Sequence, residues 1–145
     1  MDYPRVLAID YGSARIGLAV SDPLCIIARE LQTLPNDRRV WERISDIVRD
    51  QEVGTIVVGM PLNLKGEKSQ KTHEVEDFVQ QLKAHTDRDV IVWDERFTTI
   101  IAQRRLKEMN APRRDRRAQS GRVDRMAAAV ILQSYLDSRK SSLNC

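Results

Sequence analysis

The chain has 145 residues, which is long enough to bury a hydrophobic core. Its composition, with 41% hydrophobic and 31% charged residues, is typical of a globular protein and excludes a disordered one. The N-terminus lacks a signal peptide and no apolar run approaches membrane-spanning length, so we expect a cytoplasmic protein without membrane association. Two histidines and two cysteines, Cys25 and Cys145, without a CxxC spacing speak against a zinc site, and we expect both thiols to be reduced.

The net charge of +3 is distributed unevenly along the chain. Between residues 104 and 125, nine Lys and Arg accompany three Asp and Glu, a local charge of +6 that leaves −3 for the remainder. A basic segment on an otherwise slightly acidic protein suggests a polyanionic partner, such as nucleic acid. The alternative is a solvated loop whose charges serve only solubility.

The N-terminal third carries the clearest strand pattern. Residues 6–9 are apolar and run into Asp10, a Gly-containing segment follows at residues 11–15, and residues 16–20 are apolar again. Two short apolar runs around such a segment predict a hairpin whose strands are buried on both faces. Residues 26–34, which end before Pro35, predict a third strand, so the first three strands form an antiparallel meander.

Beyond this meander, helical and strand patterns alternate. Short β-branched or apolar runs predict strands at residues 55–58 and 90–93. Apolar spacing predicts a helix capped by Asn36 or Asp37 and ended by Gly54, one begun by Ser69 or Thr72, one capped by Thr98 or Thr99 and stopped before Pro112, and one from about Val123 to Leu136. Residues 113–121 are predicted to be a basic loop.

This order of elements predicts an α/β fold. Its mixed five-stranded sheet has three antiparallel strands and then two parallel ones, and helices flank it. No interior linker is long enough to divide the chain. We expect residues 1–139 to form a single domain and residues 140–145 a short C-terminal tail.

Several carboxylates follow the predicted strands directly. In α/β sheets, active sites lie at the C-terminal ends of the parallel strands. Asp10 ends the first strand, and Asp94 and Glu95 end the fifth. Strand alternation places only one of this pair on a given face, and spacing does not say which. Asp124 of the last helix lies on the side of Ala127 and Ala128, which are small enough to let that helix approach the sheet closely.

Carboxylates that converge beside a basic segment suit hard divalent cations. Mg²⁺ takes oxygen ligands from one or two carboxylates together with substrate phosphates. Two such ions catalyse phosphodiester hydrolysis by in-line displacement. Each residue also has a simpler explanation: Asp10 could cap a turn, Asp124 could act as an N-cap, and Glu95 could pair with Arg96.

Four blocks of sequence occur in order along almost the whole chain. They are DYGSARIG at residues 10–17 with AVSDP at 19–23, GMPL at 59–62, DERFTT at 94–99, and Asp124 followed by AA at 127–128 and ILQ at 131–133. With these blocks the chain resembles the YqgF (RuvX) family of bacterial proteins with an RNase H-like fold, described as pre-16S rRNA nucleases and Holliday junction resolvase-like proteins. The resemblance implies that Asp10, Glu95 and Asp124 are the catalytic, metal-binding triad, which selects Glu95 over Asp94.

The first block departs from the family pattern. The family usually reads Asp-x-Gly-Thr-Lys-Arg there, whereas this chain has Ser13 and Ala14 at the Thr and Lys positions and keeps Arg15. Loss of that lysine removes one phosphate contact, so more of the grip on substrate falls to the remaining basic residues. We expect nucleic acid to be bound by Ser13, Arg15, Arg96, Arg104, Arg105, Arg113, Arg114, Arg116, Arg117 and Arg122.

The resulting hypothesis is an endonuclease that depends on Mg²⁺ or Mn²⁺, with two ions, and processes the 5′ end of pre-16S rRNA in ribosome biogenesis. Its expected partners are structured RNA and ribosomal particles, with the protein a monomer or a homodimer. The first alternative is a Holliday junction resolvase, which would act on four-way DNA as a symmetric dimer. The second is a non-catalytic factor that binds nucleic acid or ribosomes. A third alternative is a phosphotransferase of the actin and hexokinase type. That class requires a second domain and an adenosine-binding glycine block, and this chain has neither the length nor the Gly-Gly.

Overall fold

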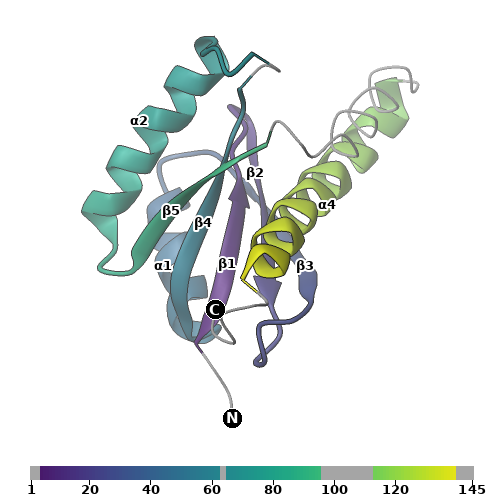
Figure 1. Ribbon diagram of the computed structural model, residues 1–145. Coiled ribbons are helices and arrows are strands. Elements are labelled where there is room, and N and C mark those ends of the chain that lie inside the picture. The colour runs from purple at the N-terminus through teal and green to yellow at the C-terminus, as the bar shows by residue number, and fades with distance from the viewer. Residues whose placement is uncertain (1–3, 63–64, 96–112, 140–145) are drawn as a thin grey trace.

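A computed structural model of the chain describes residues 4–62, 65–95 and 113–139, with only the backbone described for residues 113–120. The elements follow along the chain as β1 (Arg5–Asp10), β2 (Arg15–Ser21), β3 (Ala28–Pro35), α1 (Val40–Asp50), β4 (Val53–Met60), α2 (Gln70–His85), β5 (Asp89–Asp94) and α4 (Arg113–Ser138) (Figure 1).

The five strands form one sheet in the order β3-β2-β1-β4-β5, so β1 is the central strand. β1 pairs antiparallel with β2, and β2 pairs antiparallel with β3. β4 pairs parallel with both β1 and β5, as strands joined through helices do. The predicted mixed sheet is therefore confirmed, and its parallel strands β1, β4 and β5 end at one common edge.

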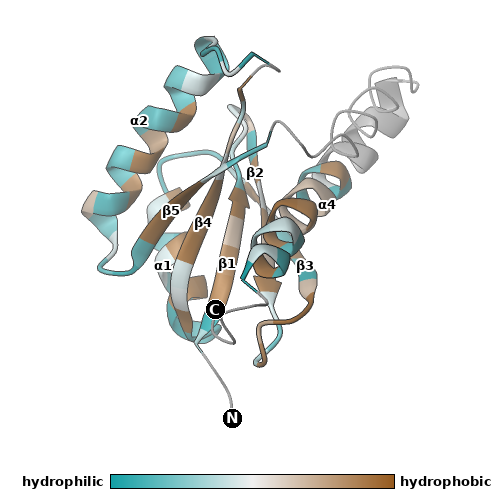
Figure 2. Cartoon of the chain, viewed as in Figure 1, coloured by the Kyte–Doolittle hydropathy of each residue, from teal (hydrophilic) through white to brown (hydrophobic). Residues whose placement is uncertain are grey.

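Helices cover both faces of the sheet (Figure 1). α1 and α2 pack on one face, where Leu7 and Ile9 of β1 are buried, whereas α4 packs on the other, where Val6 and Ala8 are buried. The hydrophobic residues of the strands and the inward sides of the helices make up these two layers (Figure 2). Because side chains alternate along β1, Asp10 lies on the α4 face.

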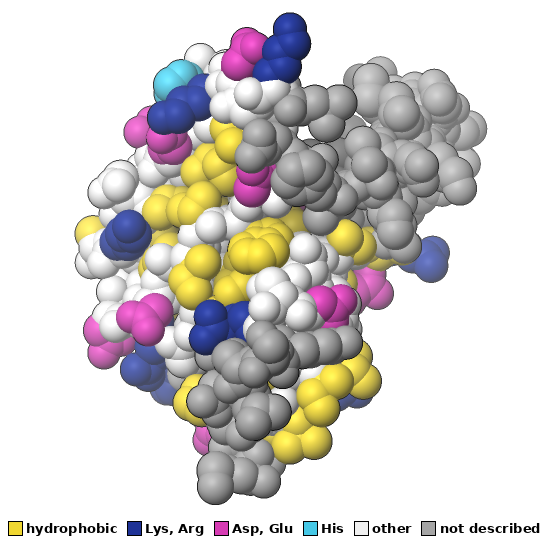
Figure 3. All heavy atoms as spheres, viewed as in Figure 1, with side chains coloured by type: hydrophobic (Ala, Val, Ile, Leu, Met, Phe, Trp, Pro, Cys, Tyr) yellow, Lys and Arg dark blue, Asp and Glu magenta, His cyan; other side chains and the backbone are white. Residues whose placement is uncertain are grey.

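α4 covers mainly β1, β2 and β3 and leaves part of the sheet less covered. In the space-filling view, hydrophobic side chains are visible over β4 and β5, between α2 and α4 (Figure 3). Ile91 and Trp93 of β5 are accordingly only partly buried on this face. The indole nitrogen of Trp93 donates to the hydroxyl of Ser134 at 3.2 Å, which ties β5 to α4.

The last helix begins earlier than predicted. Residues 113–121, predicted as a basic loop, belong to α4, which starts at Arg113 and not near Val123. The prediction was wrong because it took a lack of apolar residues for a loop, although Arg, Ala and Gln are strong helix formers at solvated positions. The helix predicted near residues 98–110 lies outside the described residues.

The ends of the first two helices differ in how well they were predicted. Ser69, one of the two predicted candidates, is the N-cap of α2, and Thr72, the other, is at N3 and forms a capping box with it. α1 has Arg39 as its N-cap without a side-chain hydrogen bond, so the capping by Asn36 or Asp37 was wrong. It ends at Asp50 and not at Gly54, because Glu52 takes a left-handed conformation with φ of 54° and turns the chain into β4.

Gly121 offers a stability test inside α4. An added Cβ would lie 3.5 Å from the hydroxyl of Thr33, which is ordinary contact, and glycine is a poor residue for a helix interior. We expect Gly121→Ala to raise the free energy of unfolding by about 0.5–1 kcal/mol. Urea denaturation of the two proteins measures this difference, and a loss of stability would show that α4 and β3 pack more tightly than described.

The loop between β2 and β3 is ordered by Asp22. Burial raises the pKa of its carboxyl, but the backbone N–H groups of Ile27 and Ile26 donate to the carboxylate at 2.8 and 2.7 Å. These hydrogen bonds prevail, and the pKa lies below its ordinary value of 3.8.

Cys25, in the same loop, is disulfide-bonded, so the prediction of reduced thiols was wrong for this residue. No described cysteine is free, and Cys145 lies outside the described residues. The prediction was based on the compartment and on the terminal position of one thiol, and neither determines whether Cys25 is bonded in the folded protein. Among the described helices, none combines the length and the apolar character needed to cross a membrane.

Candidate active site

Asp10 lies between two glycines at the edge where the parallel strands end. In the antiparallel register it faces Gly17 of β2. On its other side, the pairing of Ile9 with Val58 places Gly59 of β4 beside it. Neighbouring strands are about 4.8 Å apart, so Gly17, Asp10 and Gly59 form a row across the sheet. The Asp10 residue is only 3% exposed, which fixes its carboxylate within the rim of the core.

Asp124 lies directly over the first of these glycines. A Cβ added to Gly17 would overlap the backbone carbonyl of Asp124 and would lie 2.8 Å from its Cβ. α4 comes this close because Ala127 and Ala128, in the next turn, are small and fully buried against the sheet. The expected close approach of the last helix is therefore observed. Since α4 begins at Arg113, Asp124 lies well inside the helix and is not an N-cap.

Glu95 lies over the second glycine. Its backbone N–H donates to the carbonyl of Met60 at 3.1 Å, which continues the pairing of β4 and β5 beyond Asp94. A Cβ added to Gly59 would lie 3.0 Å from the carboxyl carbon of Glu95. Glu95 therefore shares the α4 face with Asp10, whereas alternation puts Asp94 on the α1 and α2 face. Of the two acids that spacing left equivalent, Glu95 is therefore the one on the face of Asp10, and its role in a site stays a prediction.

One basic residue already contacts this acidic group. The Nε of Arg15, at the start of β2, donates to Oδ2 of Asp124 at 3.2 Å. The side chain of Arg15 is 43% exposed and that of Asp124 is 19% exposed, so the ion pair lies at the border between the core and solvent. Arg15 precedes Gly17 by two positions and therefore rises on the same face of the sheet.

The residues fit a hard divalent cation in their donor chemistry. Three carboxylates, from β1, α4 and the residue after β5, lie on one face of the sheet, two of them packed over Gly17 and Gly59, and a guanidinium already acts as a cation for Asp124. Within residues 4–62, 65–95 and 113–139, no three His, Cys, Asp or Glu side chains are arranged as a ready-made metal site. An ion would thus require Asp124 to turn from Arg15 toward Asp10 and Glu95.

The residues predicted to bind nucleic acid divide into three groups. Ser13 is exposed between β1 and β2, Arg15 is exposed at the start of β2, and Arg122 is exposed on α4. Arg113, Arg114, Arg116 and Arg117 belong to the first turns of α4, where only the backbone is described; this end of the helix extends past the sheet (Figure 1). Arg96, Arg104 and Arg105 lie outside the described residues. Among these residues, Arg15 contacts one of the carboxylates, that of Asp124.

Three residues that position the site were missed from the sequence. Gly17 and Gly59 give space to Asp124 and Glu95, and a glycine inside an apolar strand is a signal of such close approach. Asn36 holds the turn after Asp10, because its side-chain amide donates to the carbonyl of Gly12 at 2.9 Å. That contact joins segments far apart in the sequence, and no local pattern announces it.

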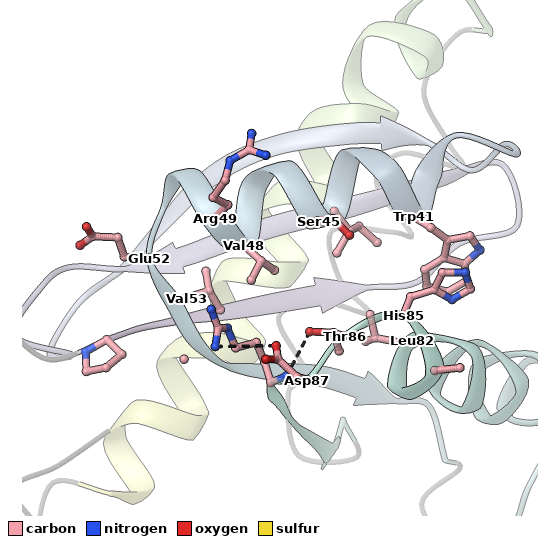
Figure 4. Close-up of a pocket in the computed structure, with 15 residues that line it drawn as sticks. Trp41, Ser45, Val48, Arg49, Glu52, Val53, Leu82, His85, Thr86 and Asp87 are labelled. Atoms are coloured by element: carbon pink, nitrogen blue, oxygen red, sulfur yellow. Dashed lines mark hydrogen bonds and ion pairs between the residues drawn. The ribbon is translucent and has the colours of Figure 1, made fainter.

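A cavity of about 860 Å³ lies elsewhere in the described part of the chain (Figure 4). It opens between α1 and the connection from α2 to β5, and Trp41, whose ring stacks on His85 at 4.5 Å, forms one wall. Val53, at the start of β4, lines it, whereas the row of Gly17, Asp10 and Gly59 lies at the other end of that strand. The cavity is therefore separate from the carboxylates.

The fold and the site together define a class: an RNase H-like domain whose central strand ends in a buried aspartate flanked by two further carboxylates. The chain belongs to the RuvX (YqgF) family, described as "Holliday junction resolvase", which matches residues 4–138. It is 38% identical over 135 residues to a protein of Sulfurihydrogenibium sp., covering 92% of this chain and 90% of that protein. It is 43% identical over 141 residues to one of Acetivibrio thermocellus, covering 93% and 96%. Both relatives are named "Putative pre-16S rRNA nuclease".

Solved structures support the same fold. RuvC of T. thermophilus, in complex with a Holliday junction substrate, superposes with a TM-score of 0.55 at 14% identity, covering 94% of this chain and 96% of RuvC. The Fowlpox virus resolvase, also in complex with junction DNA, gives 0.54 at 10% identity, covering 94% and 99%. The predicted RNase H-like fold is thereby confirmed.

Proposed function

We propose that this protein is an endonuclease that hydrolyses phosphodiester bonds in structured RNA, and that its substrate is the 5′ end of pre-16S rRNA during ribosome biogenesis. The observation that carries the proposal is the placement of Asp10 between Gly17 and Gly59 at the strand ends, with Asp124 packed over Gly17 and Glu95 over Gly59 on the same face of the sheet. Membership of the RuvX family and relatives named for this activity support the choice of substrate.

Asp10, Glu95 and Asp124 would hold Mg²⁺ or Mn²⁺, two ions in the full site. When bound, such ions activate water and neutralise charge at the leaving oxygen of a phosphodiester. The chain contributes rigidity: Asp10 is fixed by strand pairing on both sides, so little reorganisation is needed during the reaction. The two glycines contribute close packing, because the absence of a Cβ at each lets Asp124 and Glu95 lie directly against the sheet beside Asp10.

Binding of the substrate would rely on the basic residues at the same edge. Arg15 contacts Asp124 at this edge, Ser13 and Arg122 are exposed, and α4 carries four further arginines in its first turns. Contacts of this kind are electrostatic, so affinity for RNA should fall steeply with salt. Such a surface suits RNA within a ribosomal particle in the cytoplasm, and a single subunit suffices to cut one strand.

The family description favours one second candidate, resolution of four-way DNA junctions. That reaction requires two symmetric cuts, and hence a homodimer with two active sites in a fixed relation. The carboxylates and basic residues would serve both reactions alike, so the substrate and the oligomeric state distinguish the two candidates.

Cleavage of two labelled substrates side by side tests the proposal. A fragment spanning the 5′ end of pre-16S rRNA and a four-way DNA junction would each be incubated with Mg²⁺, Mn²⁺ or EDTA, using wild type and Asp10→Asn. We expect metal-dependent cleavage of the RNA by the wild type alone. Preferred cutting of the junction would favour resolution, and binding to either substrate without cutting, under any metal, would favour a non-catalytic binding factor.

A further inference from the structure

Arg15 and Asp124 form an ion pair inside the proposed metal site. Their Nε and Oδ2 atoms are 3.2 Å apart, and the two residues are separated by 109 positions in the sequence, so the contact belongs to the tertiary structure. The backbone of Asp124 packs closely on Gly17, whereas Arg15 lies at the start of β2 and its side chain is more exposed. The backbone of Asp124 is therefore fixed in place, and of the two side chains the guanidinium of Arg15 is the more exposed.

A guanidinium and a divalent cation compete for one carboxylate. Both are attracted by the negative charge, and they repel each other when both are close to it. An ion that bound between Asp124, Asp10 and Glu95 would weaken the hold of Asp124 on Arg15. The released guanidinium would then need another anion, and a phosphate group is the ligand that its planar set of donors fits best.

We propose that Arg15 is an exchangeable cation of this site: it neutralises Asp124 in the metal-free protein and transfers to a substrate phosphate when a divalent ion takes its place. This inference rests on the proposed function, because it requires the metal site. It makes Arg15 a positioning residue that couples binding of the ion to binding of the nucleic acid. Binding of the divalent ion to Asp124 and binding of the phosphate to Arg15 both require the ion pair to break. Each of the two ligands therefore favours binding of the other.

Mn²⁺ binding to the intact protein tests the exchange without any need for catalysis. The free Mn²⁺ concentration would be followed by electron paramagnetic resonance in titrations of wild type, Arg15→Gln, Asp124→Asn and the double variant. Arg43→Gln serves as the matched control, because Arg43 also forms an ion pair, with Asp37 at 2.8 Å, away from the carboxylates. Thermal melting of each variant would verify that it is folded.

We expect Arg15→Gln to bind Mn²⁺ about 5-fold more tightly than wild type, which corresponds to removal of an ion pair of ~1 kcal/mol. The same change in the Asp124→Asn background should leave Mn²⁺ affinity unaltered, as should Arg43→Gln in the wild type. Equal or weaker Mn²⁺ binding by Arg15→Gln overturns the exchange while leaving the metal site intact. Absence of Mn²⁺ binding by wild type and Arg15→Gln alike overturns the metal site itself, and with it the proposed function.

Discussion

Substituting Gly17 with alanine is expected to reduce cleavage by about 100-fold or more, although residue 17 has no side chain of its own to offer the reaction. The new Cβ would overlap the backbone carbonyl of Asp124, so α4 must move away from β2. A displacement of about 1 Å in a catalytic group is enough to cost about 100-fold in rate. Overpacking should also lower the free energy of unfolding by about 1–3 kcal/mol. Initial cleavage rates and urea denaturation measure the two effects.

The matched control for Gly17→Ala is Gly121→Ala, which makes the same chemical change at another contact of α4 with the sheet. There the added Cβ meets only ordinary contacts, so activity should be retained. Full activity of Gly17→Ala would show that Asp124 does not need its observed position. Asp124 would then be excluded from the proposed metal site.

Replacing Glu95 by glutamine is expected to lower the cleavage rate by about 100-fold or more, because one negative charge facing the reaction is lost. The adjacent substitution Asp94→Asn removes the same charge one residue earlier, on the other face of the sheet. It should leave the rate within a few-fold of wild type. Steady-state cleavage assays at saturating Mg²⁺ would compare the two variants directly.

Strand alternation places the two substituted residues on opposite faces of the sheet, so the two variants together test which face carries the site. Asp94 pairs in register with Met60, which is buried on the α1 and α2 face, whereas the carboxyl carbon of Glu95 lies against Gly59 on the α4 face. An equal loss of activity in both variants would mean that the effect is one of net charge. A larger loss of activity in Asp94→Asn than in Glu95→Gln would place the site on the α1 and α2 face, contrary to this account.

Much of the fold could be predicted from local pattern. The apolar runs on either side of Asp10 and Gly12 are enough for a hairpin, and apolar spacing locates α1 and α2. The start of α4 could not be predicted in the same way. The sequence of its first turns contains almost no apolar residues, so hydrophobic periodicity gives no signal there, and only the helix propensity of residues such as arginine favours a helix.

The candidate site was predicted less completely. The sequence singles out Asp10 as a carboxylate at a strand end, but it leaves Asp94 and Glu95 equivalent, and the preference for Glu95 came from the resemblance to the RuvX family. The structure supplies an independent reason, because it puts Glu95 on the face of Asp10 and Asp124. What no sequence pattern contains is the distance between α4 and β2, which depends on the contact of Asp124 with Gly17.

The central claim is that Asp10, Glu95 and Asp124 hold the divalent ions at the common edge of the parallel strands. Diffraction from crystals soaked in Mn²⁺, at a wavelength where manganese scatters anomalously, tests it most directly. We predict anomalous peaks between these three carboxylates, with the side chain of Arg15 moved away from Asp124, and no such peaks in Asp10→Asn. Manganese bound only elsewhere, in a protein that still cleaves RNA with Mn²⁺, would contradict the claim.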